Sequence, residues 1–138
     1  MQRFLLISSL LFISQIPLPA AEARSDDQTI LDTATKWLAI MDVGQYAQAY
    51  EAYPQRITSG GLEQNFVGFM RARRLPLGNV LSRNVVKVSR QRKLRGAPDG
   101  DYSVIEYETS FEHKAGAAET VILTSENGYW QVSGYQFH

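Results

Sequence analysis

The sequence predicts an α+β domain: three N-terminal helices packed on one face of a curved, four-stranded antiparallel meander, after a signal peptide. Three observations support this prediction. Residues 25–74 repeat apolar side chains at helical spacing, residues 80–137 alternate apolar and polar side chains between turn signals, and residues 4–16 form a short apolar run. We therefore divide the chain into a signal peptide, 1–23, and a single domain, 24–138.

The first residues have the layout of a secretory signal peptide. Arg3 precedes the apolar run, and Pro17 and Pro19 end any helix. Ala21 and Ala23 place small residues at the two positions that a signal peptidase reads. The run is too short for a comfortable membrane span. We expect cleavage after Ala23 and export to the periplasm or the medium. The alternative is an uncleaved anchor, because the segment before the apolar run carries a single arginine, which is little positive charge for a signal peptide.

Three helices are expected in the first half of the mature chain. A capping box from Ser25 to Gln28 predicts the start of the first helix, and Gly44 predicts its end. Residues 45–52 predict a shorter helix that Pro54 ends. A third helix, 62–74, is expected after a flexible break at two glycines.

Four strands are expected in the second half. The alternation of the first strand fails near Val85, which predicts a β-bulge there. On the second strand, Tyr107 and Phe111 are expected to face the helices, and the glutamates between them to face water. The strands are expected at 80–93, about 102–112, 119–125 and 129–137, with turns at 96–100, 115–116 and 126–128.

Composition excludes several kinds of chemistry. The chain has no cysteine, which excludes disulfides, thiolate nucleophiles and cysteine metal sites. Two histidines, His113 and His138, are too few for a histidine-rich metal centre. We expect no cofactor and no metal. We also expect His113 to be exposed at a strand end and Asp42 to organise the turn after the first helix.

The charges are unevenly distributed, although their sum is zero. Residues 64–98 contain nine cations and no acid, whereas 99–126 contain seven acids and a single lysine. One interpretation is a basic patch for an anionic partner such as lipid headgroups. The interpretation we favour is that a basic strand pairs with the acidic strand that follows it. Export further disfavours nucleic acid as a partner.

Six segments stand out by their order and spacing: Trp37 to Tyr50, Arg74 to Arg83, Pro98 to Tyr102, Tyr107 to Glu112, Glu119 to Val121 and Gly128 to Tyr135. Together they resemble a bacterial exported family catalogued as domain of unknown function 4019. The resemblance covers nearly the whole mature chain. It implies membership of the nuclear transport factor 2-like (cystatin-like) superfamily, whose cone of helices on a curved sheet often encloses a pocket. It implies no activity and no catalytic residues.

The side chains expected to point into such a cone are mostly aromatic, and Phe66 and Phe69 belong to them. Trp130 has the opposite strand parity from Tyr135 and is expected to face outward. Isomerases and dehydratases of this architecture need a buried carboxylate or imidazole to move protons. The ligand-pocket candidates are Trp37, Tyr46, Tyr50, Tyr107, Phe111 and Tyr135.

The expected function is therefore a non-catalytic domain that binds a small ligand or another protein. The alternative is a small-molecule enzyme of isomerase or dehydratase type that uses the cone pocket. The expected partners are a small apolar or aromatic ligand and a second copy bound through the sheet face. No nucleic acid, and no stable membrane span after signal cleavage, is expected. Tyr107→Phe and Tyr135→Phe are expected to leave folding intact and to weaken a bound ligand.

Overall fold

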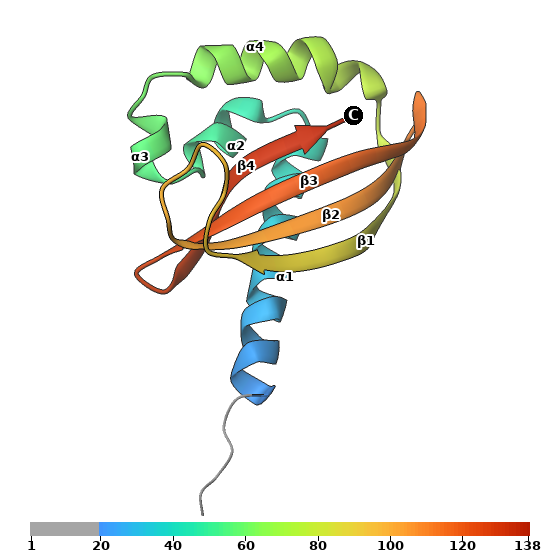
Figure 1. Cartoon of the computed structure of the whole chain (residues 1–138). Helices are drawn as coiled ribbons and strands as arrows, with labels where there is room; N and C mark the ends of the chain where they lie inside the picture. Colours follow the sequence, from blue (N-terminus) through green and yellow to red (C-terminus); the bar gives the residue numbers. More distant parts are fainter. Residues whose placement is uncertain (1–19) are drawn as a thin grey trace, which may run out of the picture.

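Helices precede an antiparallel sheet in the order that the sequence predicts. The computed structural model describes residues 20–138, with side chains from residue 26. Helix α1 crosses one face of the curved sheet and contacts β4 and β3, while α4 lies over α2 (Figure 1). The elements are α1 (Ala20–Asp42), α2 (Tyr46–Glu51), α3 (Gln55–Thr58), α4 (Glu63–Arg73), the 3₁₀ helix η1 (Leu75–Leu77), β1 (Val80–Gln91), β2 (Asp101–Phe111), β3 (Lys114–Glu126) and β4 (Tyr129–Phe137).

The helical region differs from the prediction at two places. Helix α1 runs through Ser25, so the predicted capping box is wrong, and the Gln28 amide instead donates to Asp32 at 2.8 Å. The short helix α3 is an addition. Pro54 ends α2 as predicted, but its carbonyl then accepts the amides of Ile57 and Thr58 at 2.8 and 3.2 Å and begins α3.

The expected leader lies mostly outside the described residues. Its last four residues, 20–23, form the start of α1, and residues 1–19 are not described. None of the described helices is long and apolar enough to cross a membrane. Cleavage after Ala23 stays a prediction.

The sheet has the simple order β1-β2-β3-β4, with every neighbour antiparallel. The predicted bulge in β1 is confirmed, since its register with β2 shifts between Val85 and Lys87. The predicted hairpin turn after Glu126 is confirmed as well, and Asn127 and Gly128 both have positive φ, 53° and 79°. The predicted turn at 115–116 is wrong, because the chain reverses three residues earlier, at Glu112 and His113, and Phe111 already pairs with Lys114.

A second bulge, in β4, overturns the expected orientation of Trp130. Leu123 pairs with Val132 while Ile122 pairs with Gly134, so Ser133 is the extra residue on β4. An extra residue reverses the parity of the strand beyond it. Trp130 and Tyr135 therefore both face the helices, and Trp130 packs against the core instead of facing outward.

The core lies between α1, α2 and the inner face of the sheet. Trp37 donates its indole N–H to the carbonyl of Ala49 at 2.8 Å, which ties α1 to α2. Its ring stacks on Tyr53 at 5.7 Å between centroids and meets Tyr135 at 5.3 Å. Phe69 is 53 % exposed, so its expected inward position is wrong, while Phe66 packs against the core from α4.

Candidate functional site

Two arginines and two carboxylates from four different elements meet in one network beside the core. Asp42, at the end of α1, accepts a hydrogen bond from Arg74 Nη2 through Oδ1 at 2.7 Å. Arg83 on β1 donates to both Asp42 oxygens, from Nη1 at 2.8 Å and from Nη2 at 2.9 Å. Arg83 Nε also donates to Glu119 Oε1 on β3, at 2.8 Å. The formal charges of the four side chains sum to zero.

Neutral side chains complete this network. Glu119 accepts a hydrogen bond from Thr109 Oγ1 at 2.6 Å and a short one from the Tyr135 hydroxyl. The Tyr135 oxygen in turn accepts from Arg74 Nε at 3.2 Å. The Arg74 guanidinium carbon lies 4.3 Å from the centre of the Phe111 ring, a cation–π contact. We call these seven residues the buried charge network: Asp42, Arg74, Arg83, Thr109, Phe111, Glu119 and Tyr135.

Burial makes this network sensitive to the loss of any partner. Arg74 is 2 % exposed and Glu119 is fully buried, whereas the Asp42 side chain is 25 % exposed and reaches solvent. A buried charge is tolerated only when it is paired and hydrogen-bonded. Burial alone would lower the pKa of Arg83, but its hydrogen bonds to Asp42 and Glu119 outweigh burial and raise that pKa.

Tyr135 in this network and Tyr107 beside it stay protonated at neutral pH. Burial is the largest cause that raises the pKa of Tyr135, and the neighbouring charge of Glu119 raises it further. The phenol is therefore a proton donor to the carboxylate. Burial also raises the pKa of Tyr107 to about 12. The Tyr107 hydroxyl is buried and has no hydrogen-bond partner among the described residues.

The six ligand-pocket candidates divide into two groups. Phe111 and Tyr135 belong to the buried charge network, and Tyr107 is the cross-strand partner of Glu119. Trp37, Tyr46 and Tyr50 are buried in the helical half of the core. The structure therefore brings all six into one interior, and their role in holding a ligand stays a prediction.

The sequence does not predict most of the buried charge network. Arg74, Arg83, Thr109 and Glu119 are not among its candidate site residues, and Asp42 is expected only to organise a turn. One signal was available: Ala117, Glu119, Val121 and Leu123 alternate along β3, which places a glutamate at a core-facing position. The exposed positions of Glu106, Glu108, Glu112 and His113 are confirmed.

Among the described residues, the ion pairs expected between the first two strands are found only near their turn. Arg92 contacts Asp101 at 2.6 Å and Lys93 contacts Asp99 at 3.9 Å. Arg90 instead reaches α1, where it contacts Asp27 at 2.9 Å. The other arginine of β1, Arg83, likewise pairs with other elements, through Asp42 on α1 and Glu119 on β3.

A pocket of about 260 Å³ opens at the surface end of the buried charge network. Asp42, Tyr46 and Arg74 line its floor, and Val43 and Leu75 form its rim, 70 % and 55 % exposed. We call it the mouth pocket. Its remaining lining residues are Gly44, Gly78 and Asn79.

The backbone at Gly78 fixes the edge of the mouth pocket. Gly78 has a φ of 78°, and a Cβ there would lie 2.9 Å from Cβ of Glu112. Only glycine fits such a position without strain. Nearby, the Glu112 carboxylate accepts the amide of Asn79 at 2.9 Å, so β1 starts from a defined point.

The two tyrosines beside Glu119 should respond differently to loss of their hydroxyl groups. Tyr135→Phe removes a donor to a buried carboxylate, so we expect the free energy of unfolding to fall by about 1.5–3 kcal/mol. The matched variant Tyr107→Phe removes a hydroxyl without a partner and should leave stability unchanged or raise it. Urea unfolding of both variants measures this. Equal losses for the two would contradict the hydrogen bonding described above.

No three acidic, histidine or cysteine side chains among residues 26–138 gather in a way that could hold a metal ion. The described carboxylates of the site are instead occupied by arginines and hydroxyl groups, as Asp42 and Glu119 show. The arrangement can hold the fold together and present a polar floor to a small molecule. A proton-transfer role would require that Glu119 first lose its donors.

Comparison with known proteins gives a family. No curated protein and no solved structure matches the chain. A family model described as "Protein of unknown function (DUF4019)" matches residues 33–135. The match begins within α1 and extends into β4, so it covers most of the core and the whole buried charge network. The chain therefore belongs to this family of proteins of unknown function.

Proposed function

We propose that this protein is an exported, non-catalytic binding domain that holds a small molecule in the mouth pocket. The observation that carries the proposal is the pairing of its carboxylates. Asp42 accepts three hydrogen bonds from two arginines, and Glu119 accepts three from Arg83, Thr109 and Tyr135. A pocket with an apolar rim and a few fixed polar groups is the usual form of a small-molecule site.

The same pairing weighs against the alternative of an isomerase or dehydratase. A general base needs a carboxylate or imidazole that can exchange a proton with the substrate. If Glu119 took up a proton, the charges of Arg74 and Arg83 would face only Asp42. This loss of charge balance inside the domain would lower the free energy of unfolding. We therefore favour binding over proton transfer.

The lining of the mouth pocket supports a ligand with two parts. An apolar or aromatic body would contact Val43 and Leu75 at the rim and the ring of Tyr46 below them. A hydroxyl or amine on the ligand would donate to the solvent-facing side of Asp42, since a carboxylate has lone pairs for about four bonds and three are used. This is the small apolar or aromatic ligand that the sequence predicts, with one polar group added.

The remaining expectations are part of the same proposal. We take the domain to be a bacterial member of the nuclear transport factor 2-like superfamily, on the resemblance and on its helices packed over a curved antiparallel sheet. A second copy bound through the outer sheet face stays a prediction. The signal peptide, with cleavage after Ala23, would deliver the domain to the periplasm or the medium.

Native mass spectrometry of the protein purified from the exported fraction of its host tests this proposal. We expect a mature chain beginning at Arg24 and a co-purifying small molecule. Leu75→Ser should reduce the bound fraction about tenfold, because it removes an exposed rim contact without disturbing the core. The matched control Leu62→Ser removes a similarly exposed leucine at the opposite end of α4, outside the lining of this pocket, and should keep the ligand.

Two results would count against the proposal. A chain with residues 1–23 still attached would contradict cleavage after Ala23 and favour the uncleaved anchor. Unliganded protein, or equal retention of the molecule by Leu75→Ser and the control, would remove the mouth pocket as the binding site.

A further inference from the structure

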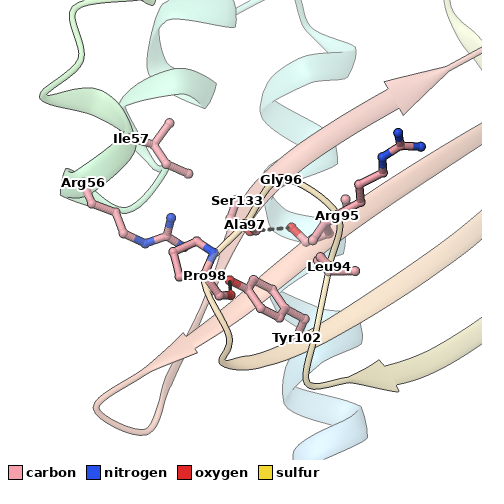
Figure 2. Close-up of a pocket in the computed structure, with 10 residues that line it drawn as sticks. Arg56, Ile57, Leu94, Arg95, Gly96, Ala97, Pro98, Tyr102 and Ser133 are labelled. Carbon is pink, nitrogen blue, oxygen red and sulfur yellow. Dashed lines mark hydrogen bonds between the residues drawn. The ribbon is translucent and has the colours of Figure 1, made fainter.

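A larger pocket lies on the other side of the molecule, beneath the loop that joins β1 to β2. It has a volume of about 350 Å³, and we call it the loop pocket. Figure 2 shows it between this loop, α3 and the outer surface of the sheet. Its walls are apolar for the most part. They include Ile57 from α3, Leu94 from the loop, Tyr102 from β2 and Ile122 from β3.

Hydrogen bonds hold the loop over this pocket. The Tyr102 hydroxyl donates to the carbonyl of Pro98 at 2.6 Å, which pins the loop to the sheet. The amide of Gly100 donates to the Arg92 carbonyl at 3.0 Å and closes the base of the loop. The pocket is therefore formed before any ligand arrives, which lowers the entropy cost of binding.

The charged side chains of the loop pocket are both cations. Arg56 and Arg95 line it, and none of its lining residues is acidic. Arg56 uses Nε to contact Glu126 at 2.6 Å, and this is the one ion pair that it makes among the described residues. Arg95 is exposed and has no ion pair among the described residues. With Glu126 counted against the two arginines, one positive charge is left at this pocket.

The two arginines are not equivalent. In Figure 2 the Arg56 guanidinium reaches toward Pro98 across the pocket, whereas the Arg95 side chain points to the other side of the loop. Arg56 is thus placed to bind a ligand directly, through the two Nη groups that Glu126 leaves free. Arg95 contributes charge at the rim.

We propose that the loop pocket binds a small amphipathic carboxylate. The carboxylate accepts hydrogen bonds from the Nη groups of Arg56, a pairing whose planar geometry suits a guanidinium. The apolar chain lies against Ile57, Tyr102 and Ile122. A monoanion matches the single unbalanced positive charge, while a neutral ligand would leave it unpaired. This site is separate from the mouth pocket and does not depend on the function proposed there.

Octanoate is a suitable probe, with binding to the ¹⁵N-labelled full chain followed by NMR. We expect the amide signals of Ile57, Gly96, Ala97 and Tyr102 to shift as octanoate is added. Octanol has the chain without the charge and acetate has the charge without the chain, and each should bind at least tenfold more weakly. Shifts confined to the mouth pocket, shifts spread over the whole surface, or none at all would overturn the proposal.

A matched pair of variants tests the role assigned to Arg56. Arg56→Gln should weaken octanoate binding about tenfold, because it removes the guanidinium that meets the carboxylate. Arg92→Gln removes an arginine at the base of the same loop that contacts Asp101 and does not line the pocket. It should change binding less than twofold. Both variants alter exposed side chains, and urea unfolding checks that both fold. Equal binding by the two would show that the anion is not held by Arg56.

Discussion

Glu119→Leu is expected to lower the free energy of unfolding by about 3–5 kcal/mol. The substitution replaces the charged side chain with an apolar one of similar size in a fully buried position. Arg83 Nε then loses its acceptor, and the hydroxyl groups of Thr109 and Tyr135 lose theirs inside the domain. Unpaired buried groups keep the full cost of their lost hydration. Urea unfolding followed by circular dichroism measures the loss.

Two further variants show whether charge balance is the cause. Glu108→Gln alters an exposed carboxylate on the adjacent strand and should change stability by no more than about 0.5 kcal/mol. The double variant Arg83→Met with Glu119→Leu removes one charge of each sign and leaves Arg74 paired with Asp42. It should be more stable than Glu119→Leu alone, because a balanced apolar replacement avoids an unpaired buried ion. If the double variant lost as much stability as Arg83→Met alone and Glu119→Leu alone lose together, this explanation would be contradicted.

Asp42→Asn is expected to lower the free energy of unfolding by about 3 kcal/mol, at the low end for a buried ion pair. The carboxylate neutralises Arg74 and Arg83 together, so its loss leaves two guanidinium groups facing Glu119 alone. The expected loss is smaller than for Glu119→Leu because the Asp42 side chain is 25 % exposed and water can solvate the arginines in part. Urea unfolding measures it.

A second aspartate on the same helix provides the control. Asp32→Asn alters an exposed carboxylate that accepts a hydrogen bond from Gln28, and we expect a change of no more than about 0.5 kcal/mol. If Asp42→Asn were equally mild, the contact between α1 and the two arginines would be a surface interaction, and the polar floor of the mouth pocket would be free to rearrange.

Local signals were enough to predict most elements of the fold, though not the short helix α3. Alternation along β2 identified the inward-facing residues Tyr107 and Phe111, because side chains of a strand alternate between its faces. The pair Asn127-Gly128 identified the last hairpin, because few residues adopt positive φ. Each of these signals depends on a few consecutive residues and on no distant contact.

The buried charge network could not be assembled in the same way. Its four charged members come from α1, from the residue after α4, from β1 and from β3, and Glu119 lies 77 positions after Asp42 in the sequence. Each charged residue on its own is typical of a surface. Of the four, only Glu119 gave a sequence signal of burial, since it interrupts an apolar series on the inward face of β3.

The sequence by itself determined the class of fold, the order of the strands, the bulge near Val85 and the exclusion of cysteine chemistry. These follow from periodicity and composition. Only the tertiary structure decided which way Trp130 faces, because one extra residue at Ser133 reverses the parity of β4. It also decided that Asp42 binds two arginines and where the two pockets lie. Such features depend on which distant elements come into contact. Strand twist, a single bulge and the pairing of buried charges determine those contacts.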